Sequence, residues 1–285
     1  MRRPLDFKLF LQSGENKIAF SKLLLKIWSA DYAAPQLANR NLVLAVKGHS
    51  YKLDSDGNTT TVTELDDYYT SQEETDTRII VYLKLVASVN DRAVVIVQSP
   101  DSDVFILLLY YSHKFTLRIL MDTGLGDNRR LINITELSHD LGTNFCKALL
   151  GLYVFTGEDT NAAFWGMGKV RPLKKLLANP KYLETFKKLG KRWETALDLY
   201  KELEEFTCLL YNTPRTKSID IVRSMKLKAM VGKSKRLTKK LMLPDCLPQT
   251  AALSSISSES ITVWLSGSAL ISMILKHRAL QSMGG

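Results

Sequence analysis

The sequence predicts an α/β fold, with a mostly parallel sheet flanked by helices and a basic helical C-terminal extension. Residues 93–97 form an uninterrupted apolar run, AVVIV, which is typical of a strand buried on both faces of a parallel sheet. Apolar residues at helical spacing precede this run from Ile79, and an apolar segment follows it from Val104. The third observation is the segment 169–240, which combines helical patterns with many lysines and arginines.

The chain has 285 residues, of which 45% are apolar, enough for one or two domain cores. We expect helices and a hairpin in 1–70, an acidic α/β core in 71–165, a basic helical region in 166–242, and a linker with a tail in 243–285. The net charge is +10, but residues 169–240 hold 20 Lys and Arg against 7 Asp and Glu, a net charge of +13. The rest of the chain is therefore at −3, so acidic and basic regions are separate.

Several classes of protein are disfavoured by the sequence. Three widely spaced cysteines predict neither a disulfide framework nor a zinc site, and charges interrupt every apolar run near Met1, so we expect an intracellular protein. The apolar run 261–275 has 15 residues, fewer than the roughly 20 of a membrane-spanning helix, and we expect a loosely packed helix or unstructured tail instead. The basic run 233–240 indicates nucleic-acid contact, nuclear import or a solvated surface, and we expect a nuclear rather than a cytoplasmic location.

Before the acidic core, the pattern predicts two helices in 5–30, a strand at 41–46, and a hairpin or loop at 51–63. We expect no site in this region. Ser71 and Glu74 then form a capping box, which predicts a helix that begins near Gln72.

After Asp103 we expect a buried helix, a strand at 116–121, a turn, and a paired strand at 131–134. Thr135 is expected to cap one helix that runs through 137–155 and carries His139 on its surface. Further helices are predicted within 182–211 and 218–230.

Two acidic pairs flank the helix and strand of the core. Glu74 and Asp76 open the helix, and Asp101 and Asp103 follow the strand. Ligands gather outside the carboxyl ends of parallel strands, and close carboxylates need a cation, for which Mg²⁺ or Mn²⁺ suits oxygen ligands. The pairs therefore predict a divalent-metal site. The alternative is structural: Glu74 caps its helix, and Asp101 and Asp103 serve only as turn and capping residues.

A glycine turn precedes the first basic helix. Gly166 and Gly168 leave backbone N–H groups accessible for a phosphate, and Lys169, Arg171, Lys174 and Lys175 add positive charge. The spacing is not that of a P-loop. A plain turn between two packed helices is the other interpretation.

Three motifs together resemble the flap endonuclease superfamily, which is XPG-type and PIN-like. They are Glu74-Thr75-Asp76, Ser99-Pro100-Asp101-Ser102-Asp103 and Gly157-Glu158-Asp159 with the glycine turn after it. The phrases SQEETDTRI, SPDSDVFILLL, LINITELSHDLG and CKALLGLYVFTGEDT are most similar to asteroid-like animal proteins of that superfamily. The resemblance covers residues 6–211.

This resemblance implies a PIN-like fold and a structure-specific nuclease that hydrolyses phosphodiesters at two divalent metals, Mg²⁺ or Mn²⁺. It implies that the metal ligands and catalytic residues are Glu74, Asp76, Asp101, Asp103 and Asp159. It also implies that the glycine turn belongs to a helix-two-turn-helix that grips duplex DNA, with DNA favoured over RNA as partner.

The sequence departs from the family at its start. Family members begin with a strand that ends in Asp and carry a second Asp after the next strand, and neither matches this sequence, where Lys47 follows 41–46. We therefore expect a sheet without its first strand, an incomplete metal cluster, and either a truncated nuclease or one that has lost cleavage. The alternative function is a nucleic-acid-binding or scaffold protein with the same fold.

Overall fold

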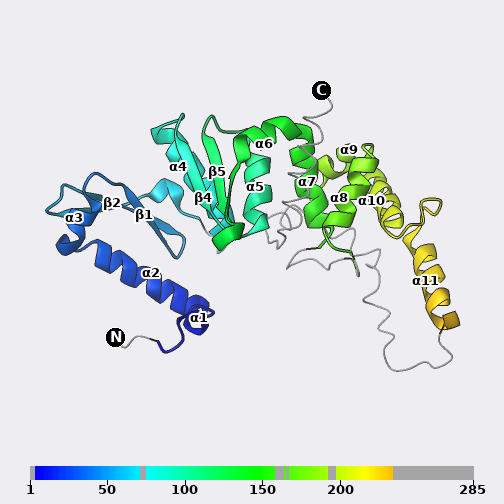
Figure 1. The fold of residues 1–285 in the computed structure, drawn as a ribbon, viewed down its shortest axis with the longest axis horizontal. Helices are drawn as coiled ribbons and strands as arrows, with labels where there is room; N and C mark the ends of the chain where they lie inside the picture. Colours follow the sequence, from blue (N-terminus) through cyan, green and yellow to red (C-terminus); the bar gives the residue numbers. More distant parts are fainter. Residues whose placement is uncertain (1–3, 71–74, 158–163, 165–166, 192–196, 234–285) are drawn as a thin grey trace. The chain divides into compact units, whose positions relative to one another are not determined.

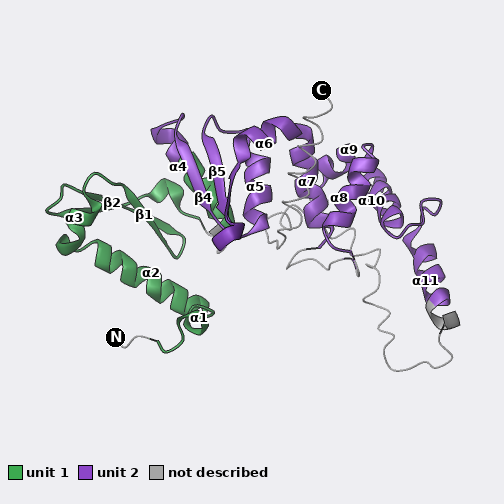
Figure 2. Ribbon diagram, viewed as in Figure 1, with its two compact units in different colours: residues 1–85 green, residues 86–285 purple. Residues whose placement is uncertain are grey.

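The computed structural model describes residues 4–70, 75–157, 164, 167–191 and 197–233. The chain divides into two compact units, Met1–Leu85 and Val86–Gly285 (Figure 2). The boundary lies within one helix, α4, which spans Thr75–Val89. The four-part division drawn from composition is not tested by this partition and stays a prediction.

The first unit contains several helices, an antiparallel sheet and most of α4 (Figure 1). Its elements before α4 are α1 Phe7–Phe10, α2 Gly14–Trp28, η1 Asp31–Ala33, α3 Ala34–Leu37, β1 Leu42–Val46, β2 His49–Ser55, β3 Thr60–Glu64 and η2 Asp66–Tyr68. The strands pair in the order β1-β2-β3. The predicted helices, strand and hairpin before the acidic core are thus confirmed.

Both hairpins of this sheet follow from their turn residues. Lys47 and Gly48 have φ values of 51° and 92°, the left-handed conformations that a two-residue hairpin turn requires. In the second turn, the Asp56 carboxylate accepts hydrogen bonds from the backbone N–H groups of Asn58 (2.8 Å) and Thr59 (2.7 Å). These bonds lower the pKa of Asp56 because they favour its ionised form.

The second unit contains a mixed sheet followed by helices (Figure 1). Its elements are β4 Val94–Gln98, α5 Ser102–Ser112, β5 Arg118–Thr123, η3 Gly126–Asn128, β6 Arg130–Asn133, α6 Ile134–Leu141, α7 Thr143–Phe155, α8 Val170–Ala178, α9 Tyr182–Lys188, α10 Leu197–Leu210 and α11 Ile219–Lys233. Strands β4 and β5 are parallel, whereas β5 and β6 are antiparallel. The α/β class is confirmed, but the described sheet is mixed rather than mostly parallel.

One face of this sheet is much more buried than the other. Val97, Ile119, Met121 and Ile132 lie on the buried face, where α5 and α6 pack against β5. On the other face, Val94 and Ile96 are each 59% exposed and Leu131 is 60% exposed. The prediction that β4 is buried on both faces is therefore wrong. Within the described sheet β4 is an edge strand, and its alternate side chains point toward solvent.

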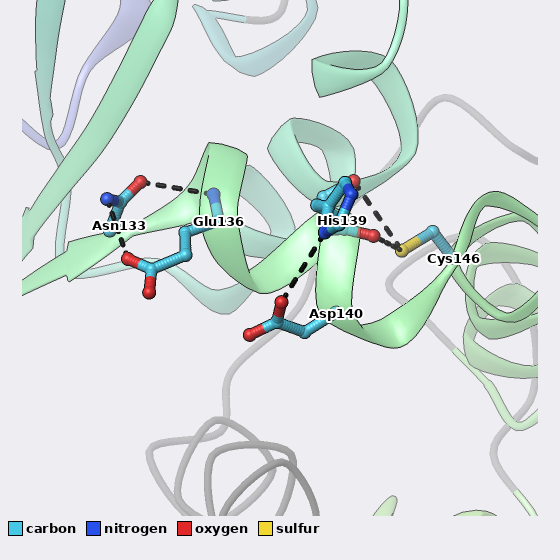
Figure 3. Close-up of polar contacts among 6 residues, drawn as sticks. Asn133, Glu136, His139, Asp140 and Cys146 are labelled. Carbon is cyan, nitrogen blue, oxygen red and sulfur yellow. Dashed lines mark hydrogen bonds and ion pairs between the residues drawn. The ribbon is translucent and has the colours of Figure 1, made fainter. Parts of the chain in front are cut away.

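The helix predicted through 137–155 is two helices. Gly142 has a φ of 79°, a left-handed conformation that ends α6 and lets α7 begin in a new direction. Asn133, and not Thr135, caps α6 by accepting a bond from the Glu136 N–H at 3.2 Å (Figure 3). The Thr135 hydroxyl instead accepts a bond from the backbone N–H of Ile119 at 2.8 Å, which ties α6 to β5.

Close helix packing continues the core beyond the sheet. A Cβ placed on Gly151 of α7 would lie 2.2 Å from the Phe186 carbonyl oxygen, so only glycine lets α9 approach this closely. Phe155, Phe186 and Phe206 pack edge to face, with Phe186 and Phe206 ring centroids 4.8 Å apart. The helical pattern predicted in 182–211 is realised as α9 and α10, and the next predicted helix is α11.

Candidate metal centre

The turn between β4 and α5 holds the first two candidate ligands. Asp101 is the N-cap of α5, and its Oδ1 accepts a bond from the Asp103 N–H at 3.2 Å. Ser99 supports this turn, because its hydroxyl accepts a bond from the Asp101 N–H at 3.1 Å. The prediction that Asp101 caps the helix is therefore confirmed. Capping uses one carboxylate oxygen for a neutral donor and leaves the charge in place.

Asp103 is buried, with 2% of its surface exposed, in the first turn of α5. Both of its carboxylate oxygens, and Oδ2 of Asp76 in the first turn of α4, each expose less than 1 Å². One oxygen from each of Asp76, Asp101 and Asp103 lies within 4.8 Å of the others. The sequence prediction that acids from α4 and from the end of β4 come together is confirmed for these three residues.

The donor set fits a hard divalent cation. Three carboxylate oxygens at this separation repel one another when no cation lies between them. A divalent cation removes that repulsion, and Mg²⁺ and Mn²⁺ prefer carboxylate oxygens. The three residues could therefore hold one metal ion, with its remaining positions left to water or a substrate oxygen.

Two of the five predicted ligands, Glu74 and Asp159, lie outside the described residues, as does Gly166 of the glycine turn. The predicted start of the helix near Gln72 also lies there. The described residues therefore contribute three carboxylates to the candidate centre, and the roles of Glu74 and Asp159 stay predictions.

Lys169, one of the predicted phosphate contacts, faces its own chain. Its ammonium group donates hydrogen bonds to the carbonyl oxygens of Tyr153 (2.7 Å) and Gly157 and to the Thr156 hydroxyl (3.2 Å). It also lies 4.0 Å from the centre of the Tyr153 ring. These acceptors are at the C-terminal end of α7, where a helix favours a cation.

The other predicted contacts of the basic helix vary in exposure. Lys174 and Gly168 are exposed, whereas Arg171 and Lys175 are half-buried on α8. The buried side of α8 is apolar, with Pro172, Leu173 and Leu176 in the core. The charges of α8 therefore lie on the outer part of an amphipathic helix.

An ion pair at the end of β5 was not predicted from the sequence. Arg129 donates from Nε and Nη2 to the two carboxylate oxygens of Asp122, at 2.8 and 2.6 Å. These bonds lower the pKa of Asp122. The signal that could have found Asp122 is its place one residue before the end of a strand parallel to β4, at the carboxyl edge of the sheet.

No Cys–His or Ser–His arrangement for nucleophilic catalysis is seen in the described residues near α6. The side chain of His139 is 89% exposed and lies 3.5 Å from the Asp140 carboxylate, as predicted for a surface residue (Figure 3). Cys146 is buried, and its thiol donates to the carbonyl and hydroxyl oxygens of Ser138, each at 3.8 Å. Burial raises the pKa of this thiol, which disfavours the reactive thiolate.

Comparisons with known proteins leave the family open. No family model matches the chain, and no curated protein and no solved structure is significantly similar to it. Among the described helices, none combines the length and apolar character that crossing a membrane requires.

Proposed function

We propose that this protein is a divalent-metal-dependent, structure-specific nuclease of the PIN-like, flap-endonuclease type. The observation that carries the proposal is the cluster of Asp76, Asp101 and Asp103, with oxygens within 4.8 Å of one another. Such oxygen-rich clusters at the carboxyl edge of a sheet suit the binding of Mg²⁺ or Mn²⁺. The proposed substrate is nucleic acid, with DNA favoured over RNA.

Each described acid has a distinct task in this proposal. Asp101 fixes the turn through its capping bond to Asp103 and presents a carboxylate at the edge of the sheet. Asp103 supplies a buried carboxylate and Asp76 supplies one buried carboxylate oxygen, Oδ2, and negative charge there favours a cation over water. A bound divalent cation supplies Lewis acidity toward the phosphodiester and toward an attacking water.

The second candidate function is nucleic-acid binding without cleavage. It is favoured by the charge of residues 169–240, at +13, and by the exposed Lys174 on α8. Cationic helices bind phosphate backbones without sequence preference, and no metal is needed. This protein would then act as a binding or scaffold protein with the same fold.

Cleavage of a 5′-labelled flap DNA with Mn²⁺ separates these functions. Asp101→Asn removes the charge but keeps a good N-cap, so it tests the ligand without losing the turn. Asp91→Asn is the matched control, because Asp91 is exposed and lies before the amino end of β4. The nuclease proposal predicts cleavage by the wild type and Asp91→Asn but none by Asp101→Asn. Equal cleavage by all three would overturn it, and binding without cleavage would support the second function.

A further inference from the structure

The ion pair between Asp122 and Arg129 lies at the same edge of the sheet as the acidic turn. Gln98 of β4 is in register with Asp122 of β5, and both residues end their paired segments. The Ser99 N–H donates to the Asp122 carbonyl at 3.1 Å, while the Ser99 hydroxyl accepts from the Asp101 N–H at 3.1 Å. Two hydrogen bonds through one serine therefore join the base of the ion pair to the turn that carries Asp101.

Arg129 is held in place by Asp122 and keeps N–H donors for a further acceptor. Its side chain is 64% exposed, whereas that of Asp122 is only 11% exposed. Nε and Nη2 each donate to Asp122, and among the described residues Arg129 makes no other side-chain bond. A guanidinium has five N–H donors, so three remain for another acceptor. A planar group fixed on one side and exposed on the other is suited to a phosphate oxyanion.

The hairpin that carries Arg129 is itself constrained. Gly124 has a φ of 85°, and a Cβ there would lie 2.3 Å from the Asn128 carbonyl oxygen. The chain therefore folds back tightly after β5, and η3 returns Arg129 to Asp122. The position of the guanidinium depends on the backbone as well as on its carboxylate partner.

We propose that the exposed side of the Arg129 guanidinium binds a phosphodiester oxyanion of nucleic acid beside the acidic turn, with Asp122 as its positioning residue. This inference rests on the proposed function, because nucleic acid is the ligand that brings a phosphodiester to this edge. Anionic carboxylates at the same edge repel a phosphate unless a cation is present, so Arg129 binds phosphate more tightly once a divalent cation is added.

The first test is the affinity for a labelled flap DNA in Ca²⁺, measured by fluorescence anisotropy as a function of salt. We expect Arg129→Gln to weaken binding about tenfold, the effect of one lost charge-assisted contact. We also expect the slope of log affinity against log salt to fall by about 0.9. Arg118→Gln is the matched control, since Arg118 is exposed and lies at the amino end of the same strand. We expect the DNA affinity of Arg118→Gln to stay within about twofold of the wild type, because Arg118 lies away from the carboxyl edge of the sheet.

The double variant Asp122→Asn/Arg129→Gln separates binding from folding. It replaces the ion pair by a neutral pair and leaves no uncompensated carboxylate. We expect it to bind DNA as weakly as Arg129→Gln. If the double variant binds DNA as tightly as the wild type, Arg129→Gln binds weakly only because it leaves the Asp122 carboxylate without its partner. That result would overturn the inference. Equal affinity of Arg129→Gln and Arg118→Gln would also overturn it, while the proposed function would stand.

A second measurement covers the case in which the wild type binds no DNA and the proposed function fails. Pyrophosphate is then titrated while the Nε–Hε NMR signal of Arg129 is observed, assigned by its loss in Arg129→Gln. A saturable shift that is smaller in the Asp122→Asn variant would support an anion site at Arg129. No shift would overturn the inference together with the proposed function.

Discussion

Asp101 and Lys169 each lie at the end of a helix, but they differ in how much of their charge the fold leaves for a ligand. At the N-terminus of α5, Asp101 caps the helix through one oxygen, and its charge still joins those of Asp103 and Asp76. At the C-terminus of α7, Lys169 donates to two carbonyls and a hydroxyl of its own chain. Both placements complement the helix dipole. A charged side chain can bind a ligand only to the extent that the fold does not already use it. The Lys169 ammonium is largely used by its bonds to its own chain.

The largest effect on stability is expected at Lys169. Lys169→Met would remove the ammonium donor from the carbonyls of Tyr153 and Gly157, of which Tyr153 keeps its bond from the Thr156 hydroxyl, and would remove the contact with the Tyr153 ring. We expect a loss of about 2–3 kcal/mol of unfolding free energy. Urea denaturation measures it, with Lys174→Met as the control, because Lys174 is an exposed cation of α8. If both variants unfold at the same urea concentration, the internal role of Lys169 is wrong.

A smaller effect is expected at the N-terminus of α5. Asp101→Ala removes the acceptor for the Asp103 N–H and should cost about 1 kcal/mol, whereas Asp101→Asn keeps an acceptor and should cost only a few tenths. Urea denaturation in EDTA compares the two variants with the wild type. Equal destabilisation by Ala and Asn would contradict the capping role of Asp101 in the apo fold.

The smallest effect is a pH dependence at the end of β5. The bonds from Arg129 hold the pKa of Asp122 below its ordinary value, so the ion pair contributes stability above that value. The contribution should be lost as the pH falls through the lowered pKa of Asp122 in the folded state. The difference in unfolding midpoint between the wild type and Asp122→Asn, measured from pH 7 to pH 2.5, should shrink only at the acidic end. A constant difference would contradict the ionic account of the pair.

The sequence predicted most elements because their signals are local. The turn at Asp56, the apolar run of β4 and the apolar stretch from Val104 in α5 each follow from neighbouring residues. Gly142 was the exception, since its left-handed conformation divides a pattern that reads as one continuous helix. The exposed face of β4 also escaped prediction, because an apolar run does not tell how many faces the rest of the chain covers.

The candidate site also contains some residues whose positions the sequence predicted and others whose positions it did not. Asp76, Asp101 and Asp103 were predicted to meet because they belong to two acidic pairs that flank one helix and one strand, and ligands gather at the carboxyl ends of strands. The orientation of Lys169 toward α7 depends on a long, flexible side chain, which sequence spacing does not fix. Asp122 and Arg129 were missed because their pairing depends on the path of the hairpin between them.

Titration of the purified protein with Mn²⁺, followed by electron paramagnetic resonance, tests the metal centre most directly. The account predicts a saturable site in the wild type and in Asp91→Asn, and affinity at least tenfold weaker in Asp101→Asn and Asp103→Asn, because each loses one of three carboxylate ligands. Mn²⁺ binding that is the same in all four proteins would contradict it.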